Sequence, residues 1–304
     1  MYLVELRGKG GQFQYAGFQS ISQLGQYFTL SINGAKTRLY TSVNCMSATN
    51  RWLMGEISEE MRGNFGDDFQ KKDEVELMDY TESATTGSRS MEKGPVDCAL
   101  PLLIKKYDDG FFTSEFISPD FKGTIQVSRS LGAGLALQEK KPGKIILMAG
   151  GTGIYPFIDT IDILYKKALV DANHAKKEKI LSLNPAVGDP WLNEFTFEVA
   201  ASFQNPTDIH PMTLFQLSEL CDLLPGRFVC SLKVSHPGND FPKKYPGIRL
   251  TSERFEGFLN KQLSSEEKID GISQMYMCGP TRMTGSILKA FDQYSISTEK
   301  YTII

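Results

Sequence analysis

The sequence predicts two domains, a small antiparallel β barrel followed by an α/β domain with a mostly parallel sheet. In the first half, short β-rich runs are separated by turn dipeptides, of which Asn33-Gly34 is the clearest hairpin signal. In the second half, apolar strand-like runs alternate with segments of helical spacing, which is typical of parallel sheets with crossover helices. We therefore expect one domain at 1–141 and a second at 142–304.

In the first domain, residues 27–32 and the run that ends at Thr41 form the expected hairpin. Residues 99–116 are expected to hold another strand, an Asp-Gly turn and a short helix, and 123–132 a further strand. Short strands with turn chemistry favour a small barrel. Residues 47–96 are rich in charge, Ser, Thr and Gly, and they are too many for a hairpin loop. We interpret them as an insertion that is partly helical or partly disordered.

The second domain begins with a continuous apolar run at 145–148, as expected of a strand that is buried on both faces. A helix should follow from Pro156, because the apolar residues after it have helical spacing. Residues 170–193, Lys-rich and then Pro/Gly-rich, are expected to be a second insertion. The later expected elements are strands at 194–202, 227–235 and 273–283, the last ending in a loop, and helices at 210–224 and 254–263.

Composition excludes several classes of function. The 304 residues carry a net charge of -3, which does not favour a general role in binding nucleic acid or an anionic membrane. The five cysteines are scattered and the three histidines lack ligand spacing, so we expect neither a disulfide framework nor a metal site. No run approaches the ~18 apolar residues of a membrane span. We expect a cytoplasmic protein, with an organelle such as the mitochondrion as the alternative.

A glycine-rich turn, Gly150-Gly151-Thr152-Gly153, joins the first strand of the second domain to its helix. Such a turn presents backbone N–H groups and a positive helix end to a pyrophosphate. It is not a GxGxxG motif, so on its own it is equally consistent with a tight corner. A second loop, Cys278-Gly279-Pro280, ends a later strand and should face the same crevice. Its cysteine can lie against a flat ring or be an ordinary core residue.

A third motif, RLYTS at 38–42, lies in the expected barrel. Alternation along the strand places Arg38 and Tyr40 on one face and Thr41 on the other. An arginine can bind a pyrophosphate, a tyrosine can flank a planar ring, and a hydroxyl can bond a ring nitrogen. An ordinary strand with a packed tyrosine and a solvated arginine is the alternative.

These three motifs, in this order, resemble the ferredoxin reductase superfamily, specifically its cytochrome b5 reductase branch. The resemblance covers most of 25–46 and 97–304, outside the two insertions. It implies an antiparallel flavin-binding barrel followed by a Rossmann-like nucleotide-binding domain, with FAD and NADH as cofactors. It further implies that hydride passes from NADH to FAD, and that electrons leave singly to a haem or iron–sulfur partner.

The same resemblance assigns roles to residues. Arg38 would contact the flavin pyrophosphate, Tyr40 would lie along the flavin ring, and Thr41 would bond its reactive nitrogen. Asn44 stands where the family has Ser or Thr. Thr41, Thr152 and Cys278 form the implied catalytic set. The other implied cofactor contacts are Leu39, Lys105, Tyr107, Gly110, Phe112, Thr113 and Ser114 toward the flavin, and Gly150, Gly151, Gly153, Pro156, Gly279, Pro280 and Met283 toward the nicotinamide nucleotide.

The choice of nucleotide is expected to depend on the segment after the second strand, AASFQNPTDIH. It has no Arg or Lys to pair with a 2′-phosphate, whereas Asp208 can accept hydrogen bonds from ribose hydroxyls and would repel that phosphate. This favours NADH over NADPH. A helix-capping role for Asp208 is the alternative.

A non-catalytic function is the alternative to a reductase, because fold alone does not fix function. Tyr155 is bulkier than the residue usual beside the glycine turn, and Thr281 and Arg282 replace prolines of the family's loop. In this second hypothesis the chain is a structural subunit of a larger assembly, and the insertions 47–96 and 170–193 are its partner surfaces.

Overall fold

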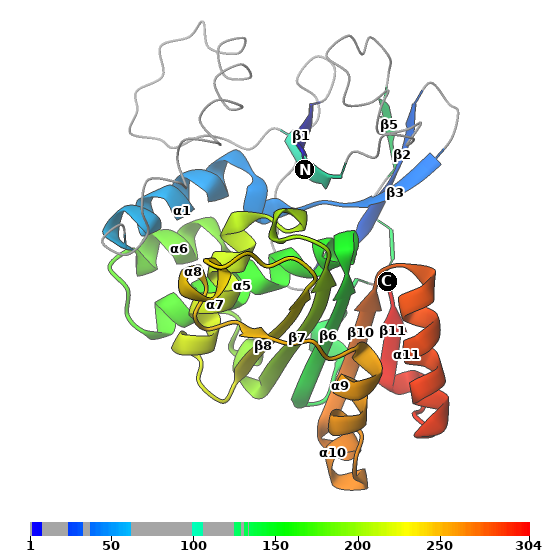
Figure 1. The fold of residues 1–304 in the computed structure, drawn as a ribbon. Coiled ribbons are helices and arrows are strands. Elements are labelled where there is room, and N and C mark those ends of the chain that lie inside the picture. The colour runs from blue at the N-terminus through cyan, green and yellow to red at the C-terminus, as the bar shows by residue number, and fades with distance from the viewer. Residues whose placement is uncertain are drawn as a thin grey trace, which may run out of the picture.

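The computed structural model describes residues 2–7, 24–32, 37–61, 99–105, 125–128, 131–132 and 134–304. Its larger part is a six-stranded sheet of order β11-β10-β6-β7-β8-β9 in which every neighbouring pair is parallel (Figure 1). The order reverses beside β6, which lies between β7 and β10. The strands are β6 (Gly143–Gly150), β7 (Phe195–Phe203), β8 (Phe228–Val234), β9 (Arg249–Leu250), β10 (Ile272–Cys278) and β11 (Tyr301–Ile303).

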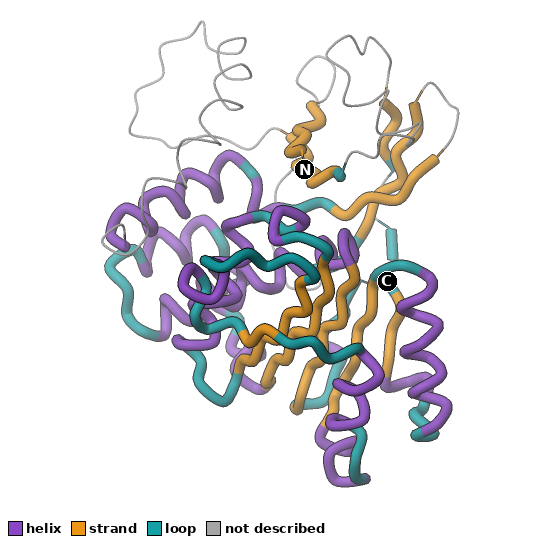
Figure 2. Tube along the Cα trace, in the orientation of Figure 1, coloured by secondary structure: helices purple, strands orange, loops and turns teal. Residues whose placement is uncertain are grey.

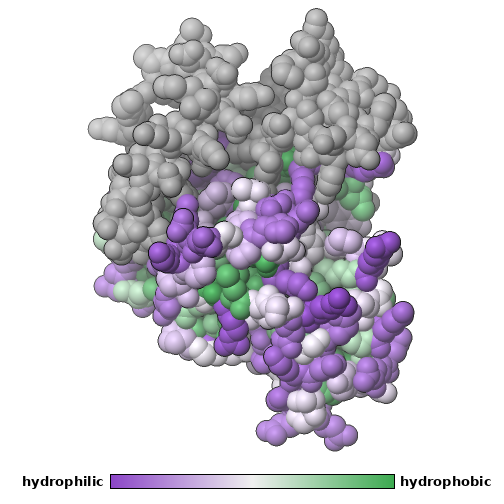
Figure 3. Space-filling model, in the orientation of Figure 1, coloured by the Kyte–Doolittle hydropathy of each residue, from purple (hydrophilic) through white to green (hydrophobic). Residues whose placement is uncertain are grey.

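Helices cover both faces of this sheet, as the apolar run at its centre predicts. Ile145 and Leu147 belong to the core that holds α5 (Tyr155–Asp171) and α7 (Pro211–Leu223). Ile146 and Met148 face the other way, toward α9 (Phe255–Gln262) and α11 (Thr281–Gln293). The strand β6 is thus buried on both sides. Figure 3 shows hydrophilic residues over α9, α11 and α10 (Glu266–Gly271) in the lower part of the view, where these helices face solvent.

The first half forms two antiparallel sheets, which fit the expected barrel. One has the order β3-β2-β5 and joins β2 (Tyr27–Ile32), β3 (Thr37–Thr41) and β5 (Ile125–Val127); the other pairs β1 (Tyr2–Arg7) with β4 (Ala99–Ile104). Strands β2 and β3 pair antiparallel, as the predicted hairpin requires, with Tyr27 opposite Thr41 and Ser31 opposite Thr37. This register is shifted by one residue from that of a two-residue Asn33-Gly34 turn, and Asn33-Gly34 itself lies outside the described residues. A bridge between Ser42 and Leu102 links the two sheets.

The two insertions contribute helices that pack on the α/β half. Helix α1 (Ala48–Met61) places Leu53, Met54 and Ile57 in the same core as α5. The second insertion holds α6 (Lys177–Leu183), which contacts both α1 and α5. Figure 2 shows the helices α1 and α6 stacked beside the sheet. Residues 62–98 of the first insertion lie outside the described part of the chain.

Strands β1 and β11 and helix α11 were not predicted from the sequence, and the loop expected after β10 is only two residues long before α11 begins. The α/β half also contains the short helix α8 (Phe241–Lys244) and several 3-10 helices. In the described ranges, every helix is either too short or too polar to cross a bilayer.

Candidate functional site

The glycine turn and the Cys278 loop meet at the carboxyl edge of the sheet. Strands β6 and β10 are neighbours, with Ala149 opposite Cys278, so the segments that follow them emerge side by side. A side chain at Gly153 would clash with the Cys278 carbonyl. A Cβ on Gly150 would lie 2.6 Å from the sulfur of Met283 and 2.9 Å from Cδ of Pro280. We call this contact between 150–153 and 278–283 the glycine junction.

One glycine of the turn faces outward. Gly151 has a φ of +54°, a conformation that favours glycine, and a Cβ placed there would find nothing within 4 Å. The turn leads through a 3-10 segment (Gly151–Ile154) into α5, whose N-cap residue is Ile154 and whose first turn holds Pro156. A helix of 17 residues therefore directs its positive end to this point. The arrangement suits an anionic group approaching Gly151.

Tyr155, expected to crowd the turn, lies in the core. Its side chain is 8% exposed and belongs to the cluster that contains Ile154 and Phe157. The Tyr155 ring is therefore packed in the core and is not exposed beside the glycine turn.

Cys278 is partly buried, and burial raises the pKa of its thiol to about 11. The group is therefore a neutral thiol at physiological pH. A neutral thiol is a poor nucleophile but a small, polarisable surface for a flat ring. This chemistry agrees with a contact role for Cys278 rather than a covalent one.

The RLYTS motif occupies β3, and its side chains become less exposed along the strand. Arg38 and Leu39 are exposed, and Leu39 is 64% exposed, whereas Tyr40 and Thr41 are half-buried. The Arg38 guanidinium donates to the Thr37 carbonyl. Burial raises the pKa of Tyr40 to about 12, and the nearby Arg38 charge opposes that shift. Arg38 and Tyr40 thus lie on one face of β3, as the alternation predicts.

The segment after β3 is fastened directly to α5. Asp159 accepts hydrogen bonds from the backbone N–H groups of Asn44, at 3.0 Å, and of Cys45, at 2.9 Å. Its carboxylate is 4% exposed. Figure 1 shows this segment above the carboxyl ends of β6 and β7. We call this contact between Asp159 and residues 44–45 the carboxylate junction.

Two predicted site residues, one from each half, bind one another. Lys105, directly after β4, contacts Oδ1 of Asp208 at 2.6 Å. The other oxygen, Oδ2, accepts from the Asn205 N–H at 3.2 Å, which completes a capping box. Burial raises the pKa of Asp208, but these hydrogen bonds outweigh it and the net shift is downward. Asp208 is therefore an ionised carboxylate that already has hydrogen-bond partners. It caps the 3-10 turn Pro206–Asp208, whereas the following helix α7, which the capping alternative concerned, has His210 as its N-cap.

The other five predicted flavin contacts lie outside the described residues: Tyr107, Gly110, Phe112, Thr113 and Ser114.

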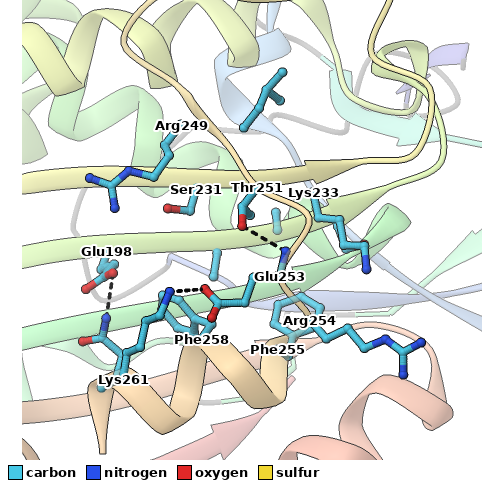
Figure 4. A pocket seen from close by; sticks show the side chains of 15 residues that line it. Glu198, Ser231, Lys233, Arg249, Thr251, Glu253, Arg254, Phe255, Phe258 and Lys261 are labelled. Atoms are coloured by element: carbon cyan, nitrogen blue, oxygen red, sulfur yellow. Dashed lines mark hydrogen bonds and ion pairs between the residues drawn. The ribbon is translucent and has the colours of Figure 1, made fainter.

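A separate hollow lies on the α9 face of the sheet, beside β8 and β9 (Figure 4). Its lining includes none of the described site residues that the sequence predicted. Glu198 accepts from Gln262 at 2.9 Å and from Lys144 at 3.3 Å, and Lys261 pairs with Glu253 at 2.9 Å. The sequence contains a pattern that could have predicted this hollow, because polar residues alternate along β7 and β8 and so lie on one face of each strand. These residues are Glu198, Ser202, Ser231 and Lys233.

Antiparallel sheets, followed by a parallel sheet with a glycine turn and a Cys-Gly-Pro loop at its switch point, form the barrel-plus-Rossmann-like fold that the sequence predicts. A solved structure, the CS-b5R domains of human Ncb5or in the NAD+ form, is similar to this chain. Its TM-score is 0.51 at 18% identity, over 94% of this chain and 61% of that chain.

Two further solved structures match at lower TM-scores. Amycolatopsis cytochrome P450 reductase GcoB matches at 0.48 and 16% identity, over 93% of this chain and 60% of that chain. A ferredoxin-NADP+ reductase mutant from Plasmodium falciparum, with 2'P-AMP, matches at 0.49 and 14% identity, over 100% and 93%. The chain thus spans about three fifths of the length of the first two structures. No protein-family model and no curated protein matches the chain.

Proposed function

We propose that the chain is an NADH-dependent flavoprotein reductase that uses FAD and passes electrons singly to a haem or iron–sulfur protein. The observation that carries this proposal is the glycine junction. Two loops, remote in sequence, meet at the sheet's switch point, and an outward-facing glycine precedes a long helix. Ligands of open α/β sheets bind at that point.

The residues present fit the nicotinamide nucleotide. Gly151 leaves open space where a side chain would stand, and the positive end of α5 points toward that space. Cys278 and Thr152 flank the junction and, in this proposal, hold the nicotinamide ring in place. Gly279, Pro280 and Met283 close the junction from the other side.

The residues of β3 fit a flavin. Arg38 supplies an exposed cation for the pyrophosphate, and the half-buried Tyr40 and Thr41 offer a ring and a hydroxyl. When bound, FAD would supply the conversion of a two-electron hydride donor into single electrons. The contribution of the chain itself is to bind and orient both rings, and to hold them at a distance where reaction is fast.

The preference for NADH is part of the proposal. Asp208 stays ionised beside the end of β7 and, because each carboxylate oxygen can accept more than one hydrogen bond, it still has capacity for ribose hydroxyls. Its negative charge disfavours a 2′-phosphate. Lys105 opposes this effect, since its ammonium group lies 2.6 Å from that carboxylate. We therefore expect a moderate preference.

Flavin content tests the proposal. The protein should purify yellow, with about one FAD per chain, and Arg38→Ala should lower the occupancy when FAD is titrated into stripped protein. A hydrogen bond to a charged group contributes about 1.5–3 kcal/mol, which predicts a loss of affinity of roughly 10- to 100-fold. Arg249→Ala, an exposed arginine on β9, is the matched control. A colourless protein that does not take up FAD would support the structural-subunit hypothesis.

A further inference from the structure

Asp159 is a buried carboxylate for which the proposed nucleotide and flavin sites have no use. It lies in α5, four residues after Tyr155, with 4% of its surface exposed. Both oxygens accept hydrogen bonds: Oδ1 from the Cys45 N–H, and Oδ2 from the N–H and the side-chain amide of Asn44 at 3.0 and 3.2 Å. Asp159 is thus bonded three times to a segment more than 110 positions away in the sequence.

A second layer of buried polar groups supports this carboxylate junction. The Asn50 side chain donates to the Asn44 carbonyl at 2.7 Å and accepts from Lys166 at 2.7 Å. Lys166 is fully buried and binds Asp162 at 2.6 Å. Asp162 also accepts from Gln216 of α7 at 2.7 Å. A chain of hydrogen bonds therefore runs from the end of the flavin motif through α1 and α5 to α7.

The two insertions meet at the outer end of this network. Lys179 of α6 pairs with Glu56 of α1 at 2.5 Å and lies 3.5 Å from the centre of the Trp52 ring. Asn184, at the end of α6, accepts from Lys166 at 3.3 Å. The described helices of the two insertions, α1 and α6, therefore contact each other. Helix α1 contributes to the core that holds α5, and α6 packs against both helices. From the sequence, the first insertion is interpreted as partly helical or partly disordered, and both insertions as partner surfaces in the second hypothesis.

Buried charges have a cost that apolar packing does not. Each must be fully hydrogen-bonded, and removing one partner destabilises the others. In return, hydrogen bonds are directional, so a buried network fixes the position of the segments it joins more sharply than apolar contact does. In this network the carboxylates and the ammonium group are bonded, whereas Asn44 Oδ1 and Gln216 Oε1 are buried without a hydrogen-bond partner. Asp159 joins two particular segments: one begins three residues after Thr41, and the other begins just behind the glycine turn.

We propose that Asp159 is a positioning residue, which sets the distance between the flavin strand β3 and the glycine junction, and that helices α1 and α6 hold it in place. This inference rests on the proposed function, because the two rings whose distance it sets are FAD and NADH. Asp159 touches neither ring; it acts through Asn44 and Cys45 on one side and through α5 on the other.

The variant Asp159→Asn tests this role. Asparagine keeps the size of the side chain but offers an N–H₂ group to N–H donors. We expect the rate of flavin reduction at saturating NADH to fall about tenfold or more, because small misplacements of reacting groups are costly. Flavin content and the Kd for NADH should change less than about twofold. A merely structural role would lower thermal stability but leave the rate per bound flavin unchanged, and that result would overturn the proposal.

Two controls keep the test informative. Asp171→Asn removes an exposed carboxylate from the same helix, where Asp171 pairs with Lys167, and it should leave the reduction rate unchanged. If Asp159→Asn does not fold, Asn50→Ala is the alternative variant: it leaves Asp159 in place and removes the bond from Asn50 to the Asn44 carbonyl and the bond from Lys166 to Asn50. It should lower the rate in the same direction by a smaller factor, and an unchanged rate would count against the proposal.

Amide hydrogen exchange separates this inference from the proposed function. The N–H groups of Asn44 and Cys45 should exchange slowly in the wild type and faster in Asp159→Asn, while those of β6 stay slow. If the wild-type protein binds no flavin, or if NADH does not reduce its flavin, the proposed function and the positioning role of Asp159 are both wrong. Amide hydrogen exchange at Asn44 and Cys45 would still test the carboxylate junction in that case. Fast exchange at both amides in the wild type would overturn the junction itself. If NADH reduces the flavin of the wild type and of Asp159→Asn at the same rate, only the positioning role is contradicted.

Discussion

The two junctions of this molecule are built in opposite ways. The glycine junction exists because side chains are missing: Gly153 lies against the Cys278 carbonyl, and Gly150 lies against Pro280 and Met283. The carboxylate junction exists because a side chain is present, and Asp159 joins two backbone N–H groups. The first brings together strands that are already neighbours in one sheet. The second holds the segment after β3, which belongs to the other half of the chain. Directional hydrogen bonds fix the position of such a segment better than close packing alone.

The difference predicts how each junction fails. A close backbone contact has no tolerance for added atoms, because neither strand can move without disturbing the sheet. At the carboxylate junction, a substitution that alters the shape of the Asp159 side chain should disrupt the hydrogen bonds. Protonation of the carboxylate changes its charge gradually with pH, so the stability that it contributes should also change gradually with pH.

Gly153→Ala should have the largest effect. The new methyl group would collide with the Cys278 carbonyl, so the loops must separate. Overpacking of this kind costs about 1–3 kcal/mol of stability, and NADH-dependent flavin reduction should fall by roughly 100-fold. Stopped-flow absorbance and urea unfolding measure the two quantities. Gly285→Ala in α11 is the control: its Cβ meets nothing within 4 Å, so stability should stay equal or rise. Equal behaviour of the two variants would contradict the close packing of the glycine junction.

Cys278→Ala should have a smaller effect at the same junction. It removes a polarisable sulfur without adding atoms, so we expect flavin reduction to slow by about tenfold while flavin content stays intact. The same stopped-flow experiment measures this change. Cys221→Ala, in α7, is the matched control. Reduction at the wild-type rate would remove Cys278 from the mechanism.

Much of the α/β half could be predicted from sequence, because a strand buried on both faces needs a continuous apolar run and β6 has one. The glycine turn and the Cys278 loop could likewise be placed at one edge from the strand order alone. The Lys105–Asp208 pair and the carboxylate junction could not, since each joins a residue of the first half to one of the α/β half, and strand order does not relate residues that belong to different sheets. One signal did exist: Asp159, Asp162 and Lys166 interrupt an otherwise apolar helix, and such charges are buried only with partners.

The carboxylate junction should respond to pH in a defined direction. Burial raises the pKa of Asp159 from 3.8 to about 7; the N–H groups of Cys45 and Asn44 oppose the shift, and Asp162 adds to it. The native state therefore binds more protons than the unfolded state between about pH 4 and 7, so this group makes stability fall as pH rises through that window. Each pKa unit corresponds to about 1.4 kcal/mol.

Urea unfolding of wild type and Asp159→Asn across this window measures the effect. The difference between the two free energies of unfolding should shift against the wild type from pH 4 to 7, since asparagine does not titrate. The Cys45 thiol, Asp162 and Lys166 also face this region; because they are present in both proteins, the difference reports Asp159 together with its coupling to these groups. A difference that is constant with pH would show that Asp159 has an ordinary pKa.

The smallest expected effect concerns nucleotide choice. Asp208→Asn removes the charge that disfavours a 2′-phosphate and leaves Lys105 without its carboxylate partner. The ratio of kcat/KM for NADPH to that for NADH should rise by about three- to tenfold. In Lys105→Met the same ratio should fall. Ratios that move in the same direction in both variants would contradict a role for this pair in selecting the nucleotide.

The central claim is that the two halves present a flavin to NADH across the glycine junction. Anaerobic mixing of the purified protein with NADH tests it most directly, with the visible absorbance of oxidised flavin as the readout. The account predicts that this absorbance bleaches within the mixing experiment and that NADPH bleaches it more slowly. A flavin that binds but keeps its absorbance at saturating NADH would contradict the account.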